Sequence, residues 1–443
     1  MKTTTRWAAA LAATTLTAAG AAGCSGGAAG DSAGGRTITY WASNQGTSIS
    51  QDEEVLGESI QRFTEETGIE VELEVIPWTD LYNRILTAIS SGEGPDVLNI
   101  GNTWAVTLQS SGAFLPWEGE ALEAIGGEDR FVASSWATGG AAGQAPTSVP
   151  LYGLAYSMYY NTAMFEAAGI TEPPATWDEF LEAAETLTQD TDGDGQIDQW
   201  GVGLAGSSYT NNVHQAFIRG LQNGGSLYDE DGEPTFTDPG VVAGVNQWVQ
   251  LMGSEGVVSP SNAELTSGTE MVEDFAQGNT AMFFDQAPSK TLAARGMEDY
   301  AAAPVPMMTA DATGLEGTQS HVAGINVSVL ESSDDQEAAI DFVAHLTSDE
   351  EQRFLNARFT ALPVVTAAYD DPAFEGEETR LKQDILANHA QPMPLFPTEG
   401  QMETLVGTAI KDLFGRIAQG QTVTEDDVRA ALEAAQSQMG AIS

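Results

Sequence analysis

Strand-like and helix-like segments alternate along this chain, and the alternation limits its fold more than any other feature. The β-branched, aromatic segment "TITYW" precedes Val55, Ile60 and Phe63, which recur at near-helical spacing before Gly68. "IEVELEVIPW" alternates apolar and acidic residues, which is the pattern of a half-buried strand. A second helical stretch opens at Thr79 and leads to the strand-like "DVLNIG". This β-α-β-α-β order predicts a parallel sheet covered by helices, with ligands outside the C-terminal ends of the strands.

The alternation resumes after residue 150, where "SMYYN", "WGVGLAG" and "TAMFF" are strand-like. Thr176 and Glu179 form a capping box at a predicted helix start. Asp238 and Pro239 suit the N-cap and first position of another helix. A chain of 443 residues is long enough for more than one core, so we expect two α/β lobes.

The charge is strongly negative, with 64 acidic against 16 basic residues and a formal net charge of −48. No basic stretch could neutralise phosphates, so nucleic acid and anionic lipid surfaces are not expected partners. The acidic residues are spread among apolar runs, and 42% apolar residues indicate a folded chain. Two interpretations of the acidity stay open: a solvated surface, or adaptation to salt that screens the self-repulsion.

The N-terminal segment determines the predicted compartment. Lys2 and Arg6 precede "WAAALAATTLTAAGAAG", a short and weakly apolar run typical of a secretory signal. Cys24 is the only cysteine, so it forms no internal disulfide. The segment resembles a bacterial lipoprotein signal, which implies cleavage of residues 1–23 and a lipidated Cys24; the alternative is an ordinary signal with a spare thiol. Residues 24–35 then form a flexible linker that reaches roughly 20 Å. We therefore expect an extracytoplasmic protein anchored to the cell membrane by lipid.

Several segments in a fixed order resemble the extracellular solute-binding proteins of ABC importers. They are "PLYGLAYSMYYNTAMFEAAGITEPPATWDEFLEAAETLTQDTDGDGQIDQWG", "SGEGPDVLNIGNTWAVTLQSSGAFLPW", "FAQGNTAMFFDQ" and "HVAGINVSVL". More narrowly, the chain is similar to the sugar-binding family that includes maltose-binding protein. The resemblance extends from residue 36 to about residue 375.

This resemblance implies an α/β, two-lobed periplasmic-binding-protein fold of type II, with the ligand cleft between the lobes and three hinge crossings. The implied ranges are 36–152 plus 307–350 for lobe 1 and 158–302 plus 360–443 for lobe 2, with crossings near Tyr152–Met158, Ala303–Pro306 and Phe359–Val364. It also implies a monomer that closes on a sugar and is recognised by permease subunits in the membrane, which work with a cytoplasmic ATPase. No catalytic residue is expected.

A sugar site needs flat aromatic rings for the C–H faces and polar side chains for the hydroxyls. Strand ends and the family resemblance together supply the candidates. The predicted ligand-binding residues are Trp41, Asn44, Gln45, Trp78, Asn102, Trp104, Tyr152, Asp285, Gln286, Gly324, Asn326 and Arg358. His214 and Asn223 flank a helix and are further candidates, although surface polarity explains them equally well.

The stretch "DTDGDGQID" places acidic residues at the spacing of a calcium loop. The predicted ligands are Asp190, Asp192, Asp194, the carbonyl of Gln196, and Asp198. The glutamate expected at the twelfth position is replaced by Gly201. Two interpretations stay open: a structural Ca²⁺ that ties a helix to a strand, or a metal-free acidic turn. No other cofactor is expected.

Two other functional classes compete with a sugar receptor. A non-sugar solute such as glycerol phosphate or a peptide is the first, and for a phosphate only Arg219, Lys290 and Arg358 stand out as cations. The second is a secreted carbohydrate-active enzyme with a pair of catalytic carboxylates. The sequence contains no GxSxG, HExxH or Walker motif, and no local pattern selects a carboxylate pair. Binding without catalysis is therefore the expected activity.

Overall fold

A computed structural model describes residues 35–439 of the chain, and Arg36 begins the compact unit to which they belong. The predicted signal segment and the Cys24 lipidation site lie outside the described residues. No helix within 35–439 is long and apolar enough to cross a membrane.

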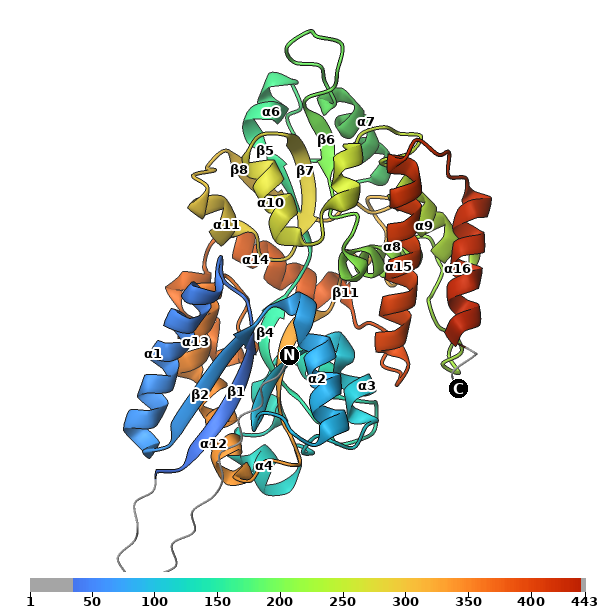
Figure 1. Cartoon of the computed structure of the whole chain (residues 1–443). Helices are drawn as coiled ribbons and strands as arrows, with labels where there is room; N and C mark the ends of the chain where they lie inside the picture. The colour runs from blue at the N-terminus through green and yellow to red at the C-terminus, as the bar shows by residue number, and fades with distance from the viewer. Residues whose placement is uncertain (1–34, 440–443) are drawn as a thin grey trace, which may run out of the picture. The chain divides into compact units, whose positions relative to one another are not determined.

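Five strands form the sheet of the first lobe in the order β2-β1-β3-β10-β4 (Figure 1). β1 pairs in parallel with β2 and β3, which confirms the predicted parallel arrangement, whereas β10 is antiparallel to β3 and β4. The strands are β1 (Thr37–Ser43), β2 (Glu70–Ile76), β3 (Val97–Gly101), β4 (Val149–Leu154) and β10 (Ala323–Val329).

Helices cover both faces of this sheet because successive strand residues point to opposite sides. Tyr40 and Phe63 bury one face together with Phe342, whose ring centroid lies 5.3 Å from that of Tyr40. Leu98 and Ile85 belong to the apolar cluster on the other face. The helices of this lobe are α1 (Ile49–Thr67), α2 (Trp78–Ser91), α3 (Ala105–Gln109), α4 (Gly119–Ala124), α5 (Ala133–Trp136), α12 (Gln336–Leu346) and α13 (Asp349–Phe359).

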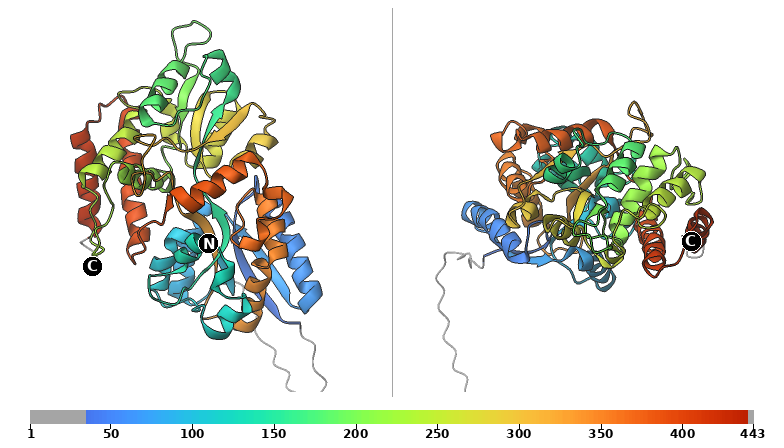
Figure 2. Two further views of the ribbon diagram at one scale, coloured as in Figure 1. Left: turned by 180° about the vertical axis from the view of Figure 1, so that it is seen from behind. Right: turned by 90° about the horizontal axis from the view of Figure 1, so that it is seen from above.

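The second lobe is built on a mixed sheet of order β6-β7-β5-β8. Its strands are β5 (Ser157–Asn161), β6 (Trp200–Gly203), β7 (Thr280–Asp285) and β8 (Tyr300–Ala303). Its helices are α6 (Thr162–Ala167), α7 (Trp177–Leu187), α8 (Tyr209–Gln222), α9 (Pro239–Gln250), α10 (Gly268–Ala276), α11 (Ser289–Ala294), α14 (Glu377–Asp384), α15 (Glu399–Ala418) and α16 (Glu425–Met439). The views in Figure 2 place α15 and α16 side by side at one flank of this lobe.

Local capping signals of the second lobe are confirmed. Thr176 and Glu179 form both hydrogen bonds of a capping box before α7. Asp238 caps α9, and Pro239 occupies its first position. These signals act within a few residues, which is why the sequence alone located both helix starts.

The predicted second-lobe boundary at residue 360 is too early. Ala361, Val364 and Val365 are buried in the core of the first lobe, and the Val132 N–H donates to the Val364 carbonyl at 2.8 Å. The chain joins the second lobe only at α14, which contacts β8. The segment "ALPVV" is apolar enough for either core, so composition gave no sign of the boundary. Near the crossings, β9 (Ser320–His321) pairs with β11 (Ala390–Gln391), just after the π-helical turn η7 (Ile385–His389).

Candidate functional site

The N-terminal half of α15 meets the first lobe at the C-terminal end of β3. The indole Nε1 of Trp104, in the 3₁₀ turn η1 (Asn102–Trp104), donates to Oε2 of Glu403 at 3.1 Å. The Gly400 N–H donates to Oγ1 of Thr107 in α3 at 3.0 Å. These two bonds join the lobes at the edge of the sheet where ligands of α/β proteins bind.

Aromatic rings from the first lobe form one wall of this junction. Trp78 and Trp104 are stacked with ring centroids 4.5 Å apart, and Tyr82 lies 4.8 Å from Trp104. Gly101 permits the stack because a Cβ there would lie 3.0 Å from the Trp78 ring. Asn44 fixes the start of α2, since its Oδ1 accepts from the Trp78 N–H at 2.7 Å.

Two glutamates one helical turn apart on α15 form the opposite wall. Glu399 and Glu403 are 0% and 1% exposed. Within the described residues, neither carboxylate oxygen of Glu399 has a hydrogen-bond partner, and neither does Oε1 of Glu403. Burial, together with the charge of Glu403, raises the pKa of Glu399 well above its usual value.

Two imidazoles lie beside these carboxylates. His214 Nε2 is 3.8 Å from Glu403 Oε1, and its Nδ1 is 3.1 Å from the hydroxyl of Tyr156. His321 stacks on His214 with centroids 4.0 Å apart. Burial, and secondarily the neighbouring His214, lowers the pKa of His321 well below its usual value. His321 is therefore neutral at pH 7.

We call these side chains the interlobe cluster. Its members are Trp78, Tyr82, Trp104, Tyr156, His214, His321, Glu399 and Glu403. Asp285 and Gln286 border it at the end of β7. Burial raises the pKa of Asp285. Burial and, secondarily, the charge of Asp285 raise the pKa of Tyr156, and the nearby Gln286 side chain opposes this shift. The cluster therefore combines aromatic rings and buried acceptors contributed by both lobes.

Only some of the predicted ligand-binding residues join this cluster. Trp78 and Trp104 belong to it, Asn44 positions Trp78, and Asp285 and Gln286 border it. Asn102 lies nearby but donates its side-chain amide to the Val322 carbonyl at 2.7 Å.

The other predicted residues have partners elsewhere. The guanidinium carbon of Arg84 lies 4.3 Å from the ring centroid of Trp41. The Gln45 amide donates to Ser43 Oγ at 3.0 Å. Tyr152 is buried in the core of the first lobe. Gly324 lies against the Tyr152 carbonyl. The side-chain amide of Asn326 donates to Ser148 Oγ at 2.9 Å. Arg358 is half-exposed, and its guanidinium lies 3.8 Å from the Glu58 carboxylate.

Sequence reasoning missed most of the acidic and imidazole half of the cluster. Glu399 and Glu403 lie beyond residue 375, where the family resemblance ends, and nothing local separates them from the other acidic residues. His214 was singled out, but with surface polarity as an equal alternative; the structure buries it at 7% exposure. Asn223, which follows the last residue of the same helix, donates its side-chain amide to Oε1 of Gln247 at 3.0 Å.

The cations considered for a phosphate ligand do not contact the cluster. The guanidinium of Arg219 is fully buried in the second lobe, 4.0 Å from the ring of Trp177 and 5.5 Å from that of Trp248. This burial lowers the pKa of Arg219 to about 9. Lys290 lies in α11, and Arg358 is on the outer surface of the first lobe.

The cluster is in a closed arrangement, because six of its eight side chains, all except the partly buried Trp78 and Tyr82, are buried where the two lobes meet. Two surface cavities are found elsewhere on the protein. One, of about 560 Å³, is lined by Arg62, His345 and Glu351 among others, and the other, of about 430 Å³, by Thr237, Arg429 and Gln436 among others. Neither contains a member of the cluster, so we place the candidate site by its side-chain contacts.

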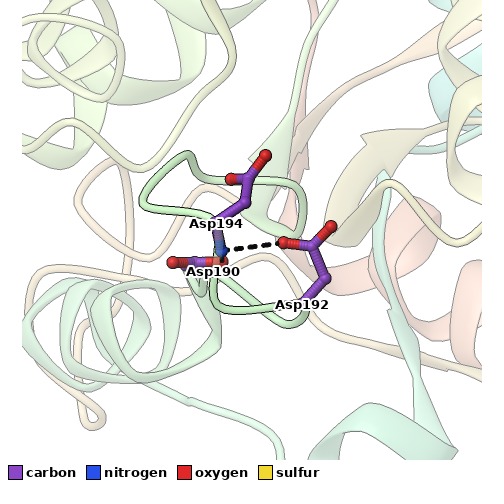
Figure 3. Close-up of side chains that lie close together, drawn as sticks. All are labelled: Asp190, Asp192 and Asp194. Carbon is purple, nitrogen blue, oxygen red and sulfur yellow. Dashed lines mark hydrogen bonds between the residues drawn. The ribbon is translucent and has the colours of Figure 1, made fainter.

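The acidic loop lies between α7 and β6, whereas the cluster lies beyond the opposite ends of the strands (Figure 1). Oxygens of Asp190, Asp192 and Asp194 come within 4.8 Å of one another (Figure 3). The Asp190 carboxylate accepts from the Gly193 and Gly195 N–H groups at 2.7 and 2.8 Å. Asp198 instead accepts from Thr191, and Gln196 donates its N–H to Asp194. Three of the five predicted ligands therefore converge.

The sequence matches the family of bacterial extracellular solute-binding proteins over residues 46–353. A putative binding protein of Brucella abortus is 29% identical over 222 residues, 49% of this chain and 50% of that protein, so the chain spans about half the length of the first curated relatives it matches. The diacetylchitobiose-binding protein DasA of Streptomyces coelicolor is 24% identical over 72% of this chain and 71% of its own.

Solved structures with low sequence identity share the fold. A solute-binding protein of Thermotoga lettingae bound to α-D-tagatose matches with a TM-score of 0.78 and 22% identity, covering 91% of this chain and all of that one. UgpB of Mycobacterium tuberculosis in complex with glycerophosphocholine matches with a TM-score of 0.74 and 20% identity, covering 92% and 98%. The two-lobed fold is therefore shared by proteins with chemically different ligands.

Proposed function

We propose that this chain, which belongs to the family of bacterial extracellular solute-binding proteins, captures one sugar between its lobes and delivers it to an ABC importer. Members of this family bind small-molecule ligands and pass them to permeases in the membrane. The observation that carries the sugar proposal is the composition of the interlobe cluster. Stacked Trp78 and Trp104 offer flat apolar surface. Both carboxylate oxygens of Glu399 and Oε1 of Glu403 are acceptors that no group within residues 35–439 satisfies.

Hinge motion would expose this site. When the lobes separate, Trp104 leaves Glu403 and the Gly400 N–H leaves Thr107, so aromatic rings remain on one lobe and carboxylates on the other. A sugar contacting both walls stabilises the closed form by its differential affinity for that form. Sugar hydroxyls donate to the carboxylates, while the C–H faces pack on the rings.

We further propose that the ligand is released chemically unchanged. Glu399 and Glu403 are neighbours on one face of α15, so they do not flank a substrate from opposite sides as the acid and base of a glycosidase do. A phosphate-bearing ligand is disfavoured, because no lysine or arginine among residues 35–439 pairs with the cluster.

Membership of an extracellular family implies an extracytoplasmic location. We propose that lipidated Cys24 anchors the protein to the membrane and that residues 24–35 serve as its tether. The protein would act as a monomer, since both walls of the cluster come from one chain.

A thermal-shift screen tests the proposed function. A ligand that binds only the native state at 100 times its Kd adds about 2.7 kcal/mol to the free energy of unfolding. We expect one class of mono-, di- or oligosaccharide to raise the Tm of the purified chain by several degrees, with and without chelator. If no sugar raises the Tm while glycerol phosphate or a peptide does, the sugar proposal is wrong.

We also propose that the acidic loop binds Ca²⁺ as a structural element. Without a bidentate glutamate at position 12, the affinity should be lower than in a sensor loop. Millimolar Ca²⁺ is expected to raise the Tm of the wild-type chain by a few degrees and to leave that of an Asp192→Asn, Asp194→Asn variant unchanged. Sugar affinity should be equal in both chains. An identical Ca²⁺ response in the variant would identify the loop as a metal-free turn.

A further inference from the structure

The carboxylates of Glu399 and Glu403 are buried without a lysine or arginine of residues 35–439 beside them. Among residues 35–439, no lysine or arginine lies within ion-pair distance of either, and the nearest basic group is His214, 3.8 Å from Glu403. Two cations of the C-terminal helices are paired with other acids: Lys382 lies 2.6 Å from Glu378, and Arg416 lies 2.7 Å from Asp427. Among the described residues, the acidic wall therefore has no lysine or arginine as a counter-charge, and Glu399 has no basic partner at all.

A buried carboxylate is costly unless a proton, a cation or several hydrogen bonds compensate it. Glu403 receives one hydrogen bond, from Trp104, and Glu399 receives none from the described residues. Glu399 is also one helical turn from Glu403, so like-charge repulsion adds to the desolvation cost. Within residues 35–439, neither acid forms an ion pair with a lysine or arginine. A ligand that supplies positive charge would explain both.

Aromatic rings complete the chemistry of a cation site. Burial raises the pKa of Tyr82, Tyr209 and Tyr228. The charge of Glu403 adds to this rise for Tyr82 and Tyr209, and that of Glu399 adds to it for Tyr228, so the three side chains lie near the two acids. The Tyr228 hydroxyl is hydrogen-bonded to Thr398, the residue before α15, at 2.9 Å. Carboxylates bind an ammonium by ion pairing, and neighbouring aromatic side chains can add cation–π attraction.

We propose that the ligand is an amino sugar with a free, protonated amine, and that Glu399 and Glu403 bind its ammonium group. This inference rests on the proposed sugar-binding function and narrows its substrate class. Trp104 and Trp78 contact the ring of the same sugar, while the ammonium replaces the missing counter-charge. Neutral sugars bind more weakly, because they leave at least one of the two buried acids uncompensated.

Three disaccharides that differ only at C2 test this proposal. Cellobiose carries hydroxyls there, chitobiose carries ammonium groups at pH 6, and N,N′-diacetylchitobiose carries neutral amides. Isothermal titration of the purified full chain with each, and with glucose, glucosamine and N-acetylglucosamine, separates charge from shape. We expect each free amine to bind at least tenfold more tightly than its neutral counterparts.

Two matched variants locate the effect. Glu399→Gln with Glu403→Gln replaces both acids by neutral amides with little change of shape and should bring the amine and its neutral counterparts within about threefold of each other. Glu70→Gln with Glu72→Gln removes two exposed charges on β2 and should keep the preference. Tm measurements on both variants verify that they are folded.

The remaining outcomes overturn the inference in distinguishable ways. If neutral sugars bind as tightly as the amines, the amino-sugar inference fails and the sugar receptor stands. If the preference survives in the Glu399→Gln, Glu403→Gln variant, these residues do not bind the ammonium. If none of the six sugars binds while another, neutral sugar raises the Tm in the thermal-shift screen, the inference fails and the sugar receptor stands. If no sugar of that screen binds either, both fail.

Discussion

Replacing Trp104 by alanine is expected to lower sugar affinity at least a hundredfold and to destabilise the closed protein by about 3–5 kcal/mol. The indole is 2% exposed, stacks on Trp78 and donates to Glu403 across the lobes. Its removal takes the central ring out of the aromatic wall. It also leaves neither carboxylate oxygen of Glu403 with a hydrogen bond from the described residues. Isothermal titration and chemical unfolding of the same preparation measure the two effects.

Trp136 provides a matched control in the first lobe. Its ring stacks on Phe131 with centroids 5.1 Å apart, and its Nε1 donates to Glu128 at 3.2 Å, so both types of contact recur away from the cluster. Trp136→Ala should lower stability and leave sugar affinity within about twofold of wild type, because these contacts lie outside the site. Equal losses of affinity in the two variants would mean that the Trp104 effect is only general destabilisation.

Gly407→Val is expected to destabilise the second lobe by about 3 kcal/mol and to weaken sugar binding at least tenfold. Gly407 lies at the contact of α15 with α8, where an added Cβ would overlap the Tyr209 carbonyl. A side chain here forces the two helices apart. Because Glu403 and Glu399 are on the same helix, one and two turns earlier, their position against Trp104 changes with it.

The control is on the same helix. At Gly415, an added Cβ would have no neighbour within 4 Å, so Gly415→Ala should raise stability by about 0.5–1 kcal/mol through helix propensity. Urea unfolding of both variants gives the comparison. If Gly407→Val unfolds at the same urea concentration as wild type, the close α8–α15 contact does not fix the acidic wall.

The parts of the fold set by local pattern were predictable. The strands around "TITYW", "DVLNIG" and "TAMFF" and the caps at Thr176 and Asp238 depend on neighbouring residues only, and all are confirmed. The rule that ligands meet the C-terminal ends of strands also selected Trp78 and Trp104, which follow β2 and β3 directly.

The rest of the site depends on information that the sequence pattern lacks. Tyr152 is on the edge strand β4 and Asn326 is on its neighbour β10. Whether such a side chain faces the cleft or the core depends on register, and a shift of a single residue reverses the side. Glu399 and Glu403 reach the site only because α15 packs on α8, nearly 200 residues earlier in the chain. No local sequence pattern predicts that helix–helix contact. Because acidic residues are spread along the whole chain, the sequence does not distinguish Glu399 and Glu403 from the others.

Native mass spectrometry of the chain with a mixture of neutral and aminated mono-, di- and trisaccharides tests the central claim most directly. Capture between two lobes of one chain predicts a single adduct, with the mass of one intact sugar, on the monomer. The same adduct should be absent from Trp104→Ala and present on Trp136→Ala. No adduct, an adduct of cleaved sugar, or an equal adduct on Trp104→Ala would contradict a sugar receptor that binds at this interlobe cluster.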